Sequence, residues 1–272
     1  MPFLEHGALS LYYESYGNGP PLLLIAGLAS DSQSWQPVIP ILAERFRVIV
    51  FDNRGSGRSR PMNDFVGVSG MAGDALLILD HLGIRAAHLL GHSMGGFIAQ
   101  ELAMRQPLRV RSLVLAATAC RISPKNSRLF IRWRDDRAKE GELEQWFREI
   151  FSWLFTRSFM ENKGEVAAAL EYAMGYPYPQ SSTAFAQQVR AMEEFDLSED
   201  LPSLTPPTLV ITGREDLLFP PESAAALARL IPSAEVATIE NAAHSIHPEQ
   251  PERFCRAVIP FLEKSTNGEC RE

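Results

Sequence analysis

The stretch LLGHSMGGFIAQ, residues 89–100, joins a short apolar run to the start of a helical pattern. Between the two lies Gly91-His92-Ser93-Met94-Gly95, in which a serine has a glycine two positions away on either side. This spacing is typical of a nucleophile elbow, a strained strand-to-helix bend that exposes a serine hydroxyl. The glycines leave room for the bend and for a close approach of helix to strand. A purely structural glycine-rich turn is the alternative, and the flanking strand and helix patterns favour the elbow.

Short apolar runs recur along the chain, and each is typical of a strand buried on both faces of a parallel sheet. They cover residues 21–27, 47–52, 86–92, 111–118 and 207–213, with a weaker run at 234–240 and an early strand at 8–16. Helical patterns alternate with them, at 35–44, 70–82, 94–106, 220–231 and 251–263. This alternation predicts an α/β fold, with a mostly parallel sheet flanked by helices.

One interval, residues 121–200, breaks the alternation because it has no buried-strand run. Helical patterns fill it instead, at 125–139, 142–155, 165–175 and 183–195. We therefore predict an all-helical cap at 121–200, inserted between sheet strands of a core formed by 1–120 and 201–264. The polar residues 265–272 are predicted to form a flexible tail.

The composition is that of an ordinary globular protein, with 272 residues, 46% hydrophobic and 22% charged. A net charge of −7 argues against nucleic acid as a partner. No apolar run approaches the length of a membrane span, and we expect no secretory signal. The three cysteines, Cys120, Cys255 and Cys270, fit neither a disulfide framework nor a metal site and indicate a cytoplasmic protein.

A serine hydroxyl becomes a good nucleophile only when a base takes its proton, so Ser93 requires a histidine. Of the six histidines, His244 fits best, because it follows the last strand in a loop with small residues before it. His247 is the weaker candidate and is expected to be a solvated loop residue. The neighbour of the serine, His92, is set aside because adjacent side chains at a strand end point apart.

An acid must hold the histidine tautomer, and Asp216 and Glu215 both follow the strand at 207–213. We choose Asp216; the other carboxylate then remains a solvated charge or a helix cap. The chain order Ser93, Asp216, His244 places the nucleophile, acid and base at the carboxyl ends of parallel strands, where α/β sites form. The oxyanion of a tetrahedral intermediate needs preorganised N–H donors, and we assign the backbone amides of Met94 and Leu28.

These motifs together resemble those of α/β-hydrolase-fold serine hydrolases over essentially the whole chain. They are AGLASDSQSW (26–35), FDNRGSGRS (51–59), GHSMGG (91–96), TGREDLLFP (212–220) and NAAHSIHPEQPERF (241–254). The chain is most similar to capped carboxylesterases and to 3-oxoadipate enol-lactonase-like enzymes, although members usually have His-Gly where this chain has Ala26-Gly27. The resemblance implies an α/β-hydrolase fold and cleavage of a small-molecule carboxylic ester or lactone through an acyl-enzyme, with neither cofactor nor metal. Serine at position 93 argues against haloalkane dehalogenases and epoxide hydrolases of this fold, which use aspartate there.

Aromatic side chains are frequent in the predicted cap, and most are needed to dock it on the sheet. A few are predicted to line a substrate pocket with core residues; the assigned residues are Trp35, Phe97, Trp133 and Trp153. Three basic residues of the first predicted cap helix are spaced so that they would lie on one face of it: Lys125, Arg128 and Arg132. We favour a solvated face for them over a site that recruits a substrate carboxylate.

Three other functions are compatible with the same residues. They are hydrolysis of a carbon–carbon bond in ring-cleavage diketones, cofactor-free perhydrolysis or haloperoxidation, and a non-catalytic ligand receptor on the same scaffold. The sequence leaves the natural substrate and the oligomeric state open.

Overall fold

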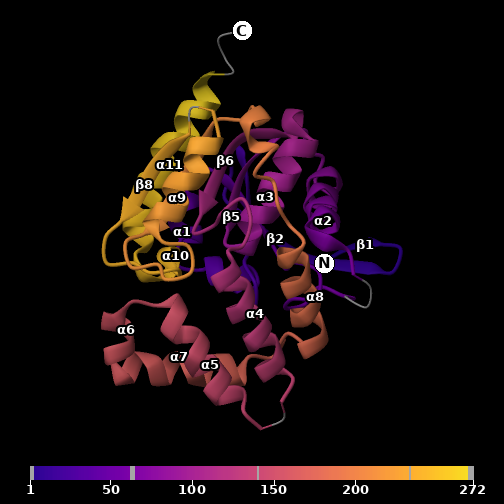
Figure 1. Cartoon of the computed structure of the whole chain (residues 1–272). Coiled ribbons are helices and arrows are strands. Elements are labelled where there is room, and N and C mark those ends of the chain that lie inside the picture. The colour runs from indigo at the N-terminus through magenta and orange to yellow at the C-terminus, as the bar shows by residue number, and fades with distance from the viewer. Residues whose placement is uncertain (1–2, 62–64, 140, 233, 269–272) are drawn as a thin grey trace.

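The computed structural model describes residues 3–61, 65–139, 141–232 and 234–268. Its centre is an eight-stranded sheet in the order β1-β2-β4-β3-β5-β6-β7-β8 (Figure 1). The strands are β1 (Phe3–His6), β2 (Leu9–Tyr16), β3 (Pro21–Ile25), β4 (Arg47–Phe51), β5 (Ala87–His92), β6 (Val110–Ala116), β7 (Thr208–Gly213) and β8 (Glu235–Ile239). β1 and β2 pair antiparallel at one edge, and from β4 to β8 all pairings are parallel. The predicted α/β fold with a mostly parallel sheet is confirmed.

The sheet separates two apolar cores, because successive side chains of a strand point to opposite faces. In β3, Leu23 and Ile25 belong to one core, while Leu22 and Leu24 belong to the other. The first core is covered by α2 (Gly67–His81), α3 (Met94–Arg105) and α9 (Pro221–Leu230), and the second by α1 (Ile39–Leu42) and α11 (Pro251–Gly268). Strands that are apolar at every position are therefore buried by helices on both sides.

The interval between β6 and β7 is helical, and Figure 1 shows α4–α7 gathered beyond one end of the sheet. The helices are α4 (Pro124–Arg137), α5 (Leu143–Leu154), α6 (Arg157–Glu161), α7 (Lys163–Gly175) and α8 (Ser182–Glu193). Side-chain caps explain where several of them begin: Ser123, Thr156, Asn162 and Ser181 each accept a backbone N–H of the first turn. We call residues 121–200 the cap. The short α6 was not predicted, because five residues carry too little periodicity.

Two expectations from the sequence were wrong. The helical pattern at 35–44 is in fact a 3-10 turn, η1 (Ser32–Trp35), followed by the four-residue α1; Pro37 and Pro40 lack the amide hydrogens of a longer helix. The predicted flexible tail begins inside α11, which continues to residue 268. There, the hydroxyl of Thr266 lies 2.9 Å from Nε2 of His88 and anchors the helix end on the sheet. Residues 269–272 lie outside the described residues.

The remaining short elements are η2 (Pro107–Arg109), η3 (Leu201–Ser203) and α10 (Ile246–Glu249). The last of these follows the loop after β8 and leads directly into α11. Within the described ranges, none of the helices combines the length and the hydropathy that a membrane span requires.

Candidate active site

Ser93 occupies the bend between β5 and α3 with φ 55° and ψ −119°, a strained backbone conformation for a residue with a side chain. Neighbouring groups hold it there. Its N–H donates to Ala116 O at 2.9 Å, and its carbonyl accepts the hydroxyl of Thr118 at 2.9 Å. The strain is thus built into the junction of β5 and β6, which is the geometry that the G-x-S-x-G spacing predicts.

The glycines of the motif are needed for close packing at this bend. A Cβ on Gly95 would overlap the carbonyl oxygen of Ile25 at the end of β3. A Cβ on Gly91 would overlap the backbone of Gly95. Any larger residue at these two positions would push α3 away from the sheet and move the serine with it.

Asp216 and His244 meet in the buried space beside the carboxyl ends of β7 and β8. Nδ1 of His244 lies 3.0 Å from Oδ2 of Asp216. The other carboxylate oxygen accepts the N–H groups of Leu218 and Phe219 at 2.8 and 2.9 Å. Because a carboxylate only accepts, Nδ1 of His244 carries the hydrogen and Nε2 keeps its lone pair.

The electrostatics of the pair favour an ionised carboxylate. Burial acts to raise the pKa of Asp216, but the His244 ring and the two amide donors outweigh it and hold the pKa below its usual value. Glu215, the alternative acid, is exposed, and only its backbone N–H turns inward, to Ala242 O. The structure therefore brings Asp216, and not Glu215, to the histidine.

The loop after β3 approaches the serine from the other side. A Cβ placed on Gly27 would lie 3.2 Å from the Cβ of Ser93. Ala29 has φ 56°, so the loop turns sharply after Leu28. Met94 is the first residue of α3, and the amides of a first helical turn have no partner within the helix. Gly27, the residue before Leu28, thus lies against Ser93, and Met94 follows the serine directly; the assignment of the Leu28 and Met94 amides as oxyanion donors stays a prediction.

His92 packs against both His244 and His247; the prediction of a solvated His247 was wrong, and the role of His92 was not predicted. His247 is not solvated: it is 2% exposed and stacks on Trp35 with ring centroids 4.2 Å apart. Nε2 of His92 donates to the carbonyl of His244 at 2.9 Å, so this neighbour of the serine supports the base loop. Burial lowers the pKa of His92 to about 3 and that of His247 well below its usual value, so both rings are neutral.

The four aromatic residues predicted for the pocket separate into two groups. Phe97, Trp133 and Trp153 belong to the core on the cap side of the sheet. Phe97 packs edge-on against Phe219, whose ring lies 5.7 Å from that of His244. Trp35, at the end of η1, lies in the opposite core and stacks on His247, so it faces away from the cap-side core. We therefore retain only the first three residues as candidates for the pocket.

The basic side chains of α4 do not form one stripe toward the site. Arg132 is exposed and pairs with Glu149 on α5 at 2.9 Å. Lys125 donates from Nζ to the carbonyl of Leu217 at 2.9 Å and lies 5.1 Å from the centre of the Trp153 ring. This arrangement favours the solvated face, with Lys125 linking the cap to the loop that carries Asp216.

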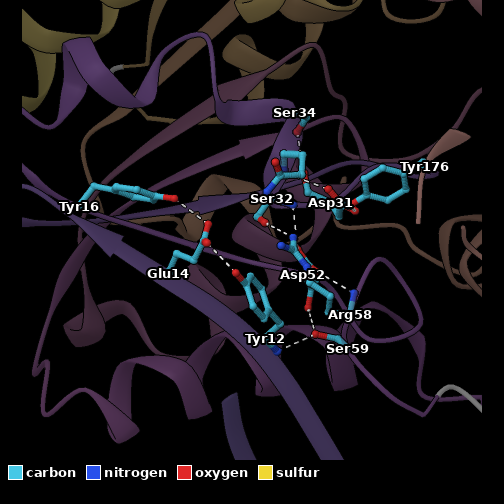
Figure 2. Close-up of polar contacts among 11 residues, drawn as sticks. Tyr12, Glu14, Tyr16, Asp31, Ser32, Ser34, Asp52, Arg58, Ser59 and Tyr176 are labelled. Carbon is cyan, nitrogen blue, oxygen red and sulfur yellow. Dashed lines mark hydrogen bonds and ion pairs between the residues drawn. The ribbon is translucent and has the colours of Figure 1, made fainter. Parts of the chain in front are cut away.

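A buried polar network that the motifs do not reveal adjoins the loop after β3 (Figure 2). The Asp52 carboxylate accepts the backbone N–H of Ser32 at 3.0 Å and the guanidinium of Arg58 at 2.7 and 3.0 Å. Asp31 accepts the hydroxyl of Tyr176, a cap residue just after α7, at 2.5 Å (Figure 2). Burial raises the pKa of Asp31, and the nearby Asp52 carboxylate adds to the rise. The cap is therefore bonded to the residue that directly follows the loop beside Ser93.

This fold and this arrangement, with a serine at a strained strand-to-helix bend beside a buried histidine–aspartate pair, define the class of α/β hydrolases. A family model of the alpha/beta hydrolase fold matches residues 20–251, and the chain belongs to that family.

Among curated proteins, the chain is 32% identical over 262 residues to a putative carbamate hydrolase RutD of Azorhizobium caulinodans, covering 96% of this chain and 98% of that protein. Among solved structures, an enol-lactonase from Burkholderia xenovorans LB400 has 28% identity and a TM-score of 0.86, over 96% of this chain and all of that one. A thermophilic esterase from Thermogutta terrifontis has 32% identity and a TM-score of 0.83, over 94% of each chain.

Proposed function

We propose that the protein is a serine hydrolase that cleaves a small carboxylic ester or lactone, with Ser93 as nucleophile, His244 as base and Asp216 as the acid that orients the base. The observation that carries the proposal is the buried 3.0 Å contact of His244 with Asp216, on the same sheet edge as the strained Ser93. The resemblance to a lactonase and an esterase supports the bond type.

In the first half of the reaction, Ser93 Oγ attacks the carbonyl carbon, and its proton passes to Nε2 of His244. The carbonyl oxygen becomes an oxyanion, and the amides of Leu28 and Met94 donate to it. His244 then returns the proton to the leaving oxygen as the ester C–O bond breaks, which leaves an acyl group on Ser93. In a lactone the leaving alcohol stays attached to the acyl chain.

In the second half, water attacks the acyl-enzyme while His244 takes its proton. The proton then goes to Oγ of Ser93, and the free acid departs. Asp216 keeps its charge throughout and stabilises the imidazolium that forms at each step. The cap would enclose a small substrate between Phe97, Trp133 and Trp153, and exclude bulk water from the oxyanion.

The similarity to carbamate hydrolases supports a second substrate class. Carbamates carry the same carbonyl group, so the same steps would form a carbamoyl-enzyme. The nitrogen substituent makes this carbonyl less electrophilic, so both its attack by Ser93 and the hydrolysis of the carbamoyl-enzyme would be slower than for an ester.

The test is covalent labelling with a fluorophosphonate, followed by intact-mass spectrometry. We expect a single adduct on the wild-type protein and none on folded Ser93→Ala. A wild-type protein that is folded and yet unlabelled would remove Ser93 as the nucleophile. Matched esters, lactones and carbamates of one acyl chain length, compared by kcat/KM, then assign the substrate class.

A further inference from the structure

The loop that carries His244 is bonded to the cap on both sides of the histidine. After it, the N–H of Ser245 donates to the carbonyl of Leu154, the last residue of α5, at 2.9 Å. Before it, the N–H of Ala243 donates to Oε2 of Glu249 at 2.8 Å. The two amides that flank the proposed base are thus both held in place.

Glu249 connects the second of these bonds to the cap. Its other oxygen, Oε1, accepts the N–H of Thr156 at 2.8 Å. Thr156 is the N-cap residue of α6, two positions after Leu154. One carboxylate therefore bridges the start of a cap helix and the residue before His244.

No cation pairs with this carboxylate among the described residues, so its charge is balanced by the two amide donors. Burial raises the pKa of Glu249. The amide bonds of Thr156 and Ala243 and a smaller contribution from the Thr156 hydroxyl oppose the rise, and the Glu215 carboxylate adds to it. Charge-assisted bonds to two amides are stronger than neutral ones, which makes the bridge directional. The carboxylate has no described contact with Ser93, Asp216 or the His244 ring.

We propose that Glu249 is a positioning residue, which makes the placement of the His244 ring depend on how the cap is seated. The inference rests on the proposed function, because it assigns importance to His244 as the base. Asp216 fixes Nδ1 of the ring, and Glu249 fixes the backbone from which the ring projects. A misplacement of about 1 Å at a reacting group can cost on the order of a hundredfold in rate.

The bridge lies at the wall of a groove of about 400 Å³ between the cap and the core. Glu165 and Glu215 line the same groove and are exposed. Since Glu165 has no side-chain hydrogen bond among the described residues, Glu165→Gln removes a charge from the groove without touching the bridge. It is the matched control for Glu249→Gln.

The first experiment compares these two variants. A glutamine at position 249 keeps the shape but turns an NH₂ donor toward one of the two backbone amides, so the bridge breaks. We expect kcat to fall by about tenfold to a hundredfold with KM within about twofold, and labelling of Ser93 by fluorophosphonate to slow in parallel. The low-field proton signal of the Nδ1–H of His244 should shift or broaden. Glu165→Gln should leave all of these unchanged.

The second experiment removes the bridge from the cap side. Thr156 has φ −62° and follows an extended Phe155, so proline fits at this position without strain. Thr156→Pro and Thr156→Ala both remove the hydroxyl that caps α6, but only proline also removes the N–H bonded to Glu249. We expect Thr156→Pro to reproduce the loss in kcat. Thr156→Ala should lose clearly less, because it keeps the N–H bonded to Glu249 and removes only the hydroxyl contact. The double variant Thr156→Pro/Glu249→Gln should lose no more than Glu249→Gln alone.

Two outcomes overturn the proposal: Glu249→Gln with the kinetics of Glu165→Gln, or Thr156→Ala with the same loss as Thr156→Pro. If Glu249→Gln fails to fold, the two Thr156 variants decide the question alone. Failure of the proposed function is seen separately, because wild-type Ser93 would then remain unlabelled.

Discussion

Three histidines, His88, His92 and His247, are buried, and burial lowers the pKa of each. They are therefore neutral in the folded protein and make the fold sensitive to acid. His88 is the clearest case: it is fully buried in β5, and its ring lies 2.7 Å from the hydroxyl of Ser112 and 2.9 Å from that of Thr266. Burial lowers the pKa of His88 to about 4, with a smaller contribution from Arg111. The folded protein therefore binds no proton here until the pH falls to about 4, whereas the unfolded chain binds one below about pH 6.5. Stability is full above the unfolded value and falls as the pH drops between the two values.

The magnitude follows from that difference. At pH 5, protonation of a histidine with a pKa of about 6.5 stabilises the unfolded chain by RT ln(1 + 10^1.5), or about 2 kcal/mol. The folded protein is stabilised by almost nothing, because His88 is still mostly neutral. At pH 7.5 protonation stabilises neither state appreciably. The perturbation is His88→Asn, which removes the titrating group and keeps a polar side chain toward Ser112. The loss of unfolding free energy between pH 7.5 and pH 5 should be about 2 kcal/mol smaller in the variant than in the wild type.

Urea denaturation, followed by circular dichroism, gives the unfolding free energy of each protein at both pH values. The change with pH in the variant is then compared with the change in the wild type. The comparison cancels the packing cost of the substitution, because that cost is present at both pH values. Equal pH dependence in the two proteins would refute the reasoning, since His88 would then have similar pKa values in both states. The result also matters for kinetics, because activity lost in acid must be separated from unfolding before it is assigned to the proposed site.

Further predictions concern the site and the seating of the cap. Asp216→Asn should lower kcat by about 10⁴-fold through the wrong histidine tautomer, whereas Glu215→Gln should retain most activity; the reverse ranking in steady-state assays would move the acid. Gly95→Ala should lower the unfolding free energy by about 1–3 kcal/mol by overpacking at the end of β3, and a thermal melt equal to wild type would contradict the described contact. Tyr176→Phe removes only the hydroxyl bonded to Asp31, and urea denaturation should show a loss of about 1.5–3 kcal/mol; an unchanged midpoint would mean that the bond contributes nothing in solution.

The sequence predicted those parts of the molecule that local patterns determine. Strands buried on both faces are apolar at every position, so β3 to β7 were visible as runs. The bend at Ser93 was visible because only glycine tolerates the close approach of α3 to β3. Asp216 and Glu215 both follow β7, and no local pattern separates them; the structure turns Asp216 to His244 and leaves Glu215 exposed.

Contacts between distant loops left no local signal. Nothing near His247 indicates that Trp35, more than two hundred positions earlier, covers its ring. The bond of Tyr176 to Asp31 joins residues 145 positions apart, and the bond of Thr156 to Glu249 joins residues 93 apart. A polar residue in a loop has the same sequence signature whether water or a folded partner satisfies it. Such partners emerge only when the loops have been placed in three dimensions.

Two of the long-range bonds of the cap reach the two loops that flank the proposed site. Tyr176 bonds the carboxylate beside the loop that carries Leu28, and Thr156 bonds the carboxylate behind His244. A buried carboxylate requires donors, and the cap supplies one to Asp31 and one to Glu249. Hydrogen bonds to charged groups contribute about 1.5–3 kcal/mol each, net of water, so these two bonds add to the apolar packing and the other hydrogen bonds that hold the cap on the core. The cap therefore contacts the loop of Leu28 and the loop of His244 at the same time, so the positions of the proposed oxyanion amides and of the proposed base are coupled through it.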